Sequence, residues 1–287
     1  MREFKGKTAV ITGGASGIGF ALANQAALRQ MNVVLADIET EALEHAIAHF
    51  EDRQVPVLGV ETDTRMRESI DNLFNQATAR FGNVHLLFNN AGVVNGGGPM
   101  PVWELPDEDW DWVMGVNFYG VLHGVRAFTP HMVAHGESGH IVNTASIAAF
   151  IPGSGPYGVS KHGVVILSEA LARDLAETAI GASVVCPGWV NTNISDAERN
   201  RPDGLKSRAN PDGQGLGLNA LLGASKSPEA LAGIVFDAIE NDNFYIFPHP
   251  GWDYMLRDHT AAMLARSSVY QFDMEAHVAT REAGEDI

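Results

Sequence analysis

Short runs of apolar, mostly β-branched residues alternate along this chain with longer segments in which apolar residues recur at helical spacing. The short runs predict strands at Thr8–Thr12, Asn32–Ala36, Val55–Val60, His85–Asn89, His140–Ala145, Ala182–Cys186 and Phe244–Phe247. The longer segments predict helices at Gly17–Gln30, Glu41–Phe50, Met66–Phe81, Glu108–His131, Tyr157–Ala176 and Pro228–Glu240. Ser227 as a cap and Pro228 at the first helical position mark the start of the last helix.

The order of these elements indicates the fold class. Strands without polar alternation are typical of sheets that are covered on both faces. Alternation of strands with helices implies parallel strands joined by right-handed crossovers. We therefore predict one α/β domain over residues 1–287, with a doubly wound, mostly parallel seven-stranded sheet and helices on both faces. Residues 195–226 are rich in Gly, Pro, Asn, Asp and Ser, and a loop of this length predicts a lid with local helical turns.

Composition and charge exclude several classes of partner. With 45% hydrophobic and 19% charged residues, the chain is neither disordered nor fibrous. The net charge of −16 repels phosphate backbones and anionic lipids, so neither nucleic acid nor membrane is an expected partner. The single cysteine, Cys186, permits no internal disulfide and no multi-cysteine metal site. We expect no metal, and a soluble protein in a reducing, cytoplasmic compartment.

A glycine-rich turn follows the first predicted strand. Its residues are Thr12-Gly13-Gly14-Ala15-Ser16-Gly17-Ile18-Gly19, and a helix begins within it. Gly13 would allow a sharp turn, Gly17 would let the backbone approach a pyrophosphate, and Gly19 would let helix and strand pack closely. The free N–H groups of the helix would face the anion. Because a strand precedes this turn and a helix follows it, the turn predicts a dinucleotide site rather than a structural loop.

Asp37 ends the second predicted strand, where a ribose-binding carboxylate is expected. A carboxylate accepts hydrogen bonds from both ribose hydroxyls and repels a 2′-phosphate. With Ile38 next to it and Ser16 in the glycine loop, we expect no Arg or Lys to pair with such a phosphate. NAD(H) is therefore the expected cofactor. The alternative is that Asp37 only caps the following helix.

A Ser, Tyr and Lys set follows the middle of the chain. Tyr157 and Lys161 are four residues apart, so on a helix they share one face and the ammonium can lie below the phenol. We expect Lys161 and an oxidised nicotinamide ring to lower the pKa of Tyr157 so that it can act as a base. Ser146, which closes the fifth strand, would hydrogen-bond the substrate oxygen. Ser154 is the alternative serine, although it lies in a turn rather than at a strand end.

These motifs, with Asn89-Asn90-Ala91-Gly92 and Pro187-Gly188-Trp189-Val190-Asn191-Thr192, resemble those of the short-chain dehydrogenase/reductase family over nearly the whole chain. The resemblance implies a Rossmann-type fold and a catalytic set of Asn117, Ser146, Tyr157 and Lys161. It implies cofactor contacts from Gly13, Ser16, Gly17, Ile18, Gly19, Asp37, Ile38, Asp63, Thr64, Asn90, Ala91, Gly92, Tyr157, Lys161, Pro187, Gly188, Val190 and Thr192. One departure is that Ser146 precedes Tyr157 by only 11 residues, so the intervening loop is short.

By resemblance, individual residues also acquire roles. Asp63 would meet the adenine amino group, and Val190 and Thr192 would hold the nicotinamide carboxamide. Lys161 would also bond the nicotinamide ribose, and Asn117 would hold a water that connects Lys161 to solvent.

The implied activity is an NAD-dependent alcohol dehydrogenase/ketone reductase that acts on a secondary alcohol or ketone. Trp103, Trp110, Trp112 and the aromatic C-terminal residues are expected by default to pack in the core or at a subunit interface. The alternative is that some of them line an apolar pocket with the lid, where Gly96–Gly98 also give room. This alternative favours a bulky, hydrophobic or aromatic substrate, such as a lignin-derived or steroid-like alcohol. Residues 243–287 would extend the family core. A homo-oligomer, tetramer or dimer, is implied through the helices around Glu108–His131 and Tyr157–Ala176. The alternatives are a non-catalytic NAD(H)-binding redox sensor, and an epimerase or dehydratase that retains its cofactor.

Overall fold

The computed structural model describes residues 1–96, 100–216, 225–266, 268–271 and 273. Within them, seven parallel strands form one sheet in the order β3-β2-β1-β4-β5-β6-β7. The strands are β1 (Thr8–Thr12), β2 (Asn32–Asp37), β3 (Val57–Glu61), β4 (Leu86–Asn89), β5 (Gly139–Thr144), β6 (Ile180–Val185) and β7 (Tyr245–Ile246). The helices around them are α1 (Gly17–Leu28), α2 (Thr40–Glu51), α3 (Arg67–Phe81), α4 (Asp107–Met114), α5 (Gly120–His135), α6 (Gly155–Asp174), α8 (Pro228–Asn241) and α9 (Asp253–Ala265). The expected Rossmann-type, doubly wound sheet is confirmed.

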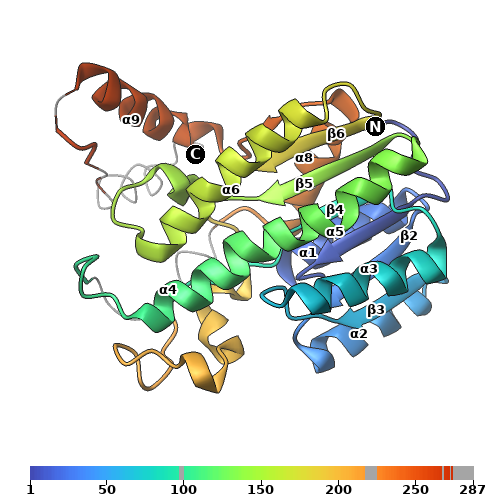
Figure 1. The fold of residues 1–287 in the computed structure, drawn as a ribbon, viewed down its shortest axis with the longest axis horizontal. Coiled ribbons are helices and arrows are strands. Elements are labelled where there is room, and N and C mark those ends of the chain that lie inside the picture. Colours follow the sequence, from blue (N-terminus) through green and yellow to red (C-terminus); the bar gives the residue numbers. More distant parts are fainter. Residues whose placement is uncertain (97–99, 217–224, 267, 272, 274–287) are drawn as a thin grey trace.

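Helices cover both faces of the sheet. Figure 1 shows α3, α5 and α6 lying side by side across one face, where their apolar side chains join those of the strands in a buried cluster that includes Leu73, Phe128 and Leu171. On the other face α1, α2 and α8 pack against a second cluster, which includes Leu22, Phe50 and Phe236. Burial on both sides explains why the strands are apolar throughout.

Several element boundaries differ from the sequence prediction. The strand expected at Val55 begins at Val57, because Pro56 has no N–H and contributes only its carbonyl, to the N–H of Val33. The last strand shrinks from four residues to Tyr245–Ile246. The single helix expected over Glu108–His131 is instead α4, a π-helical turn at Gly115–Tyr119, and α5, which continues to His135. The cap at Ser227 is confirmed, since its hydroxyl accepts a hydrogen bond from the N–H of Ala230 at 3.2 Å.

The strand order reverses between β1 and β4, and this reversal positions the site. The segments that follow these two strands turn to opposite faces of the sheet, and this opens a crevice beyond the carboxyl ends of the strands. The glycine turn follows β1, Asn90 follows β4, Ser146 follows β5 and Pro187 follows β6. All of these groups therefore meet at one edge of the sheet.

The segment between β6 and α8 contains the local turns expected for residues 195–226. Short 3₁₀ helices lie at Asn193–Asn200 and Asp203–Leu205, and residues 217–224 are outside the described part of the chain. Beyond β7, the chain forms a 3₁₀ turn at Pro250–Trp252 and then α9, which lies at the opposite end of the molecule from β3 (Figure 1). No helix among the described residues is both long enough and apolar enough to span a bilayer.

Candidate active site

One cavity beyond the carboxyl ends of the strands collects almost all of the predicted site residues. The predicted residues that line it are Gly13, Ser16, Gly17, Ile18, Asp37, Ile38, Asp63, Thr64, Asn90, Ala91, Gly92, Ser146, Tyr157, Lys161, Pro187, Gly188, Val190 and Thr192. Two predicted residues are not part of this lining. Gly19 lies behind the turn, where a Cβ would collide with the carbonyl oxygen of Gly13, and Asn117 is fully buried beside the cavity.

The glycine turn has the geometry that close approach to a ligand requires. Gly13 and Gly17 have φ angles of +63° and +52°, in the left-handed region that glycine adopts without strain. A Cβ at Gly13 would lie 2.9 Å from the Cα of Ala91, so this position is also too tight for a side chain. Ser16 precedes α1 and its side chain makes no cap hydrogen bond. The N–H groups of the first turn of α1 are therefore placed to face an anion in the cavity.

Asn90 joins the ends of β1 and β4. Its side-chain amide donates to the carbonyl of Thr12 at 3.0 Å, and its backbone N–H donates to the Thr12 hydroxyl at 2.9 Å. The same hydroxyl accepts from the N–H of Ala91 at 3.1 Å. These bonds hold the crevice at a fixed width. Thr12 was predicted only as part of the glycine motif, and its hydroxyl also ties the end of β1 to the loop after β4.

Asp37 lies at the other end of the cavity and is only 9% exposed. Its carboxylate accepts hydrogen bonds from the N–H groups of Ala15 at 3.0 Å and Glu39 at 3.1 Å. Burial raises the pKa of Asp37 above its ordinary value, and these two bonds act in the opposite direction. Asp37 therefore ties the glycine turn to the start of α2 in addition to facing the cavity.

The cavity that Asp37 lines also contains two arginines. Arg65 and Arg199 both line the cavity, although neither is adjacent to Asp37 in sequence. Each is held by a carboxylate: Arg65 pairs with Asp63 at 2.6 Å and Arg199 pairs with Glu39 at 2.6 Å. Reasoning from Ile38 and Ser16 alone missed them because they reach the cavity from other loops. Asp63 is accordingly half of an ion pair.

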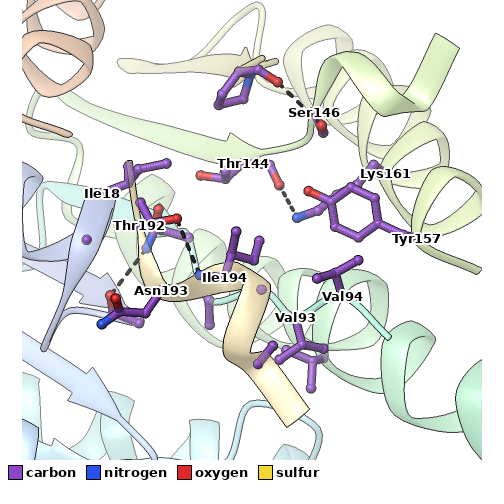
Figure 2. Close-up of a pocket in the computed structure, with 18 of the residues that line it drawn as sticks. Ile18, Val93, Val94, Thr144, Ser146, Tyr157, Lys161, Thr192, Asn193 and Ile194 are labelled. Atoms are coloured by element: carbon purple, nitrogen blue, oxygen red, sulfur yellow. Dashed lines mark hydrogen bonds between the residues drawn. The ribbon is translucent and has the colours of Figure 1, made fainter. Parts of the chain in front are cut away.

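Ser146, Tyr157 and Lys161 come together as their spacing predicts. Figure 2 shows the side chains of Tyr157 and Lys161 on the same side of α6, both directed into the cavity below Ser146. The Lys161 ammonium lies 5.7 Å from the centre of the Tyr157 ring and donates to the carbonyl of Thr144 at 2.9 Å. Ser146 caps the 3₁₀ turn at Ile147–Phe150, accepting from the N–H of Ala148. Ser154 also lines the cavity and donates to the carbonyl of Ile151.

The electrostatics of this trio differ in one respect from the sequence prediction. Burial raises the pKa of Tyr157 above its ordinary value, and a hydrogen bond with the Ser146 hydroxyl opposes this rise. Burial lowers the pKa of Lys161 to about 8. The chain by itself therefore keeps Tyr157 as a neutral phenol, because desolvation outweighs the hydrogen bond with Ser146.

Asn117 lies in the π-helical turn between α4 and α5. Its side-chain oxygen accepts from the N–H of Val93 at 2.8 Å, and its side-chain amide donates to the carbonyl of Val93 at 2.9 Å and to the hydroxyl of Ser160 at 3.2 Å. Gly92 leaves room for the Lys161 ammonium, because a Cβ at this position would lie only 3.3 Å from it. The side chain of Asn117 thus holds the loop after β4 against α6. The π turn interrupts the regular helical ladder at this point.

The chain after β6 closes the remaining wall. The Pro187 carbonyl accepts from the N–H of Ile147 at 2.9 Å, and the Gly188 N–H donates to a ring nitrogen of His249 at 3.1 Å. Thr192 caps the turn that begins at Asn193, and its side chain lies across the cavity from Tyr157 (Figure 2). Burial raises the pKa of the neighbouring Cys186 thiol to about 12, as expected for an inert buried cysteine.

Residues 7–203 match the family model for short chain dehydrogenases. The chain belongs to the short-chain dehydrogenase/reductase family. A family member from Burkholderia phymatum, crystallised in complex with NAD, is 40% identical and superposes with a TM-score of 0.89, covering 95% of this chain and 99% of that one. A C alpha-dehydrogenase of Sphingobium sp. strain SYK-6 is 32% identical over 96% of this chain and 91% of its own length. A 1-deoxy-11-beta-hydroxypentalenate dehydrogenase of Streptomyces exfoliatus is 34% identical, with 88% and 86% covered.

A buried ion cluster that the sequence did not reveal anchors the segment after β6 in this dehydrogenase/reductase. Arg201 pairs with Asp109 of α4 at 2.9 Å and with Glu198 at 2.7 Å, and all three side chains are at most 3% exposed. Glu198 also accepts from the N–H of Gly96 at 2.6 Å. Charges at i and i+3 on a short 3₁₀ turn resemble a solvated surface pair, so the sequence carries no signal that they are buried.

The aromatic residues divide between the cavity and the surface. Trp112, Trp189 and Trp252 line the cavity, whereas Trp103 is 81% exposed. Gly97 and Gly98 lie outside the described residues. His131 and His135 have their rings 5.3 Å apart, and no three His, Cys, Asp or Glu side chains of the described residues are grouped so that they could hold a metal ion.

Proposed function

We propose that this short-chain dehydrogenase/reductase interconverts a secondary alcohol and a ketone by hydride transfer to or from NAD(H), with Tyr157 as the general acid and base. The observation that carries the proposal is that Tyr157 and Lys161 share one side of α6 and point into the cavity that also contains the glycine turn. The relatives that are named as dehydrogenases support the same reaction class.

The catalytic residues would each have a distinct task. When bound, the cofactor supplies a hydride acceptor or donor and, in its oxidised form, a positively charged ring. Ser146 would donate its hydroxyl proton to the substrate oxygen, and Tyr157 would exchange a proton with that same oxygen. In ketone reduction the neutral phenol that the structure favours is the required acid. In alcohol oxidation Tyr157 must be deprotonated, which the charge of the oxidised ring would assist.

Lys161 and Asn117 would support these steps. Lys161, with its pKa lowered to about 8, still carries its proton at neutral pH and would bond the nicotinamide ribose. Because the side chain of Asn117 is engaged by Val93 and Ser160, we place any proton path past Asn117 at its backbone in the π turn.

The cofactor preference that we propose is NAD(H). Asp37 places a buried carboxylate at the end of β2, which would accept from ribose hydroxyls and repel a 2′-phosphate. Arg65 and Arg199 are already neutralised by Asp63 and Glu39. Asp63 and Thr64 would face the adenine, and Pro187, Gly188, Val190 and Thr192 would face the nicotinamide.

A bulky apolar substrate fits the walls of the cavity around Ser146 and Tyr157. Tyr157 packs on a cluster that contains Val93 and Trp112, while Ile147, next to Ser146, packs on Trp252. Among the described lining residues, the charged ones besides Lys161 are Asp37, Glu39, Asp63, Arg65 and Arg199. Four of these five residues end or follow β2 or β3, where the dinucleotide would bind, and Arg199 lies in the segment after β6 and pairs with Glu39. Because Lys161 is then the one charged lining residue beside the substrate among those described, a hydrophobic or aromatic alcohol is favoured over an anionic one.

Two further features belong to this proposal. Residues 195–226 would act as a lid, and residues 243–287 as an extension of the core. Association through α5 and α6 is supported by exposed apolar side chains on that side, with Tyr119 49%, Val159 51% and Ile166 55% exposed. Light scattering of the purified protein would give the dimer or tetramer that we expect.

The direct test of function is a panel of secondary alcohols and ketones incubated with NAD⁺ or NADH and followed by nicotinamide absorbance. Stoichiometric NADH formation from a hydrophobic or aromatic alcohol is expected. A redox sensor would give no turnover, and an epimerase or dehydratase would convert its substrate without net NADH release. If small aliphatic alcohols are the better substrates, the apolar-pocket assignment is wrong.

A further inference from the structure

An ion pair bridges the rim of the cavity on the side of Asp37. Glu39, directly before α2, accepts from Arg199 in a two-pronged arrangement, with Nη2 2.6 Å from Oε1 and Nε 3.3 Å from Oε2. Asn200 donates to the same Oε1 at 2.8 Å. Glu39 and Arg199 are 160 residues apart in sequence, and both line the cavity, as does Asn200. The contact therefore connects the segment after β6 to the loop after β2 across the opening.

The ion pair of Arg199 differs in solvent exposure from the ion pairs of Arg201, two residues further along the chain. Arg201 faces inward and is fixed by Glu198 and Asp109, with all three side chains nearly inaccessible. The side chains of Arg199 and Glu39 are 31% and 29% exposed. Water and salt can reach the outer pair but not the inner one, so the outer contact can open while the inner anchor holds.

We propose that Glu39, Arg199 and Asn200 form a clasp that closes the cavity over a bound dinucleotide and slows its release. The proposal rests on the NAD(H) site argued above. Although partial burial acts to raise it, the pKa of Glu39 lies below its ordinary value because Arg199 and Asn200 hydrogen-bond to it, so the clasp is ionised at neutral pH. Glu39 is a positioning residue, since it acts through the segment that it holds.

The geometry and exposure of the Glu39–Arg199 pair determine how much its loss should change the rate of NADH release. Such pairs are stronger than single surface contacts, but salt still screens them. We expect loss of the clasp to speed release of NADH about three- to tenfold, where tenfold corresponds to about 1.4 kcal/mol.

The experiment measures the rate constant of NADH release by stopped-flow, as the loss of nicotinamide fluorescence when excess NAD⁺ displaces bound NADH. The variants are E39A and R199M, with E41A as the matched control because Glu41 is an exposed carboxylate in the first turn of the same helix. E39A and R199M should release NADH about three- to tenfold faster than the wild type, and E41A should not. The charge-swapped pair E39R/R199E should recover part of the slow release.

Salt gives an independent readout. At about 20 mM NaCl the ratio of the E39A rate constant to the wild-type one should be largest, and near 500 mM it should approach one, because salt opens the clasp in the wild type. A ratio within twofold of one at low salt overturns the clasp. So does an E39A variant that gains NADPH affinity with unchanged NADH release, since Glu39 would then act only against a 2′-phosphate. A wild type that binds no NADH overturns the cofactor assignment itself, which separates the two failures.

Discussion

The guanidinium of Arg201 lies 4.0 Å from the centre of the Trp112 ring and is paired on its other sides with Asp109 and Glu198. Trp112 belongs to the apolar cluster against which Tyr157 packs. One buried cation thus supports the wall behind the proposed general acid and anchors the segment that crosses the cavity. Removing only this cation would leave two carboxylates buried without it.

We therefore predict that R201M lowers the free energy of unfolding by about 3 kcal/mol, the cost of breaking a buried ion pair. R201K keeps the charge but not the planar fork, so it should lose less. Urea unfolding followed by tryptophan fluorescence measures both. A loss below about 1 kcal/mol in R201M would show that the cluster is not a structural anchor.

Asp37 should determine which dinucleotide the protein binds. NADH should bind at least about tenfold more tightly than NADPH, which corresponds to about 1.4 kcal/mol. D37N removes the charge while keeping the shape of the side chain. The ratio of NADH affinity to NADPH affinity should therefore be smaller in this variant than in the wild type. Fluorescence titration with both dinucleotides tests this, and equal affinities in the wild type would refute the ribose argument.

His140 should make the stability of the fold sensitive to acid. Burial lowers its pKa to about 4, and its Nε2 is 2.7 Å from the Ser183 hydroxyl. Between this value and the ordinary value of about 6.5, the unfolded chain binds a proton that the folded chain does not. The free energy of unfolding should therefore fall as the pH drops from about 6.5 towards 4, by up to about 3 kcal/mol from this group alone.

The measurement is urea unfolding of the wild type and of H140N at several pH values in this window. Carboxylates such as Glu137 titrate in both proteins, so the difference between the two pH profiles isolates His140. H140N should show a flatter profile. Parallel profiles would mean that the pKa of His140 is the same in the folded and the unfolded chain.

Much of the fold could be predicted from the sequence because local patterns carry it. The apolar runs that become β1 and β2 are buried on both faces, and the Ser227–Pro228 cap is a strictly local signal. The π turn at Gly115–Tyr119 was missed because one extra residue per turn barely changes apolar periodicity over a long helix. It nevertheless positions Asn117.

For the site, residues within motifs could be predicted and residues that act across the fold could not. Tyr157 and Lys161 are placed by a helical spacing that is visible in the chain. Glu39 meets Arg199 only when a segment 160 positions away folds beside it. Arg201 likewise meets Asp109 only across 92 positions of the chain. Their charges alone look like ordinary surface residues.

The central claim is that Tyr157 exchanges the proton of the reacting oxygen, and Y157F tests it most directly. The variant keeps the ring and its packing and removes only the hydroxyl. Its kcat with the best alcohol or ketone should fall by a factor on the order of 10³, while the Kd for NADH stays within about threefold of the wild type. Turnover comparable to that of the wild type, at unchanged NADH affinity, would contradict the account.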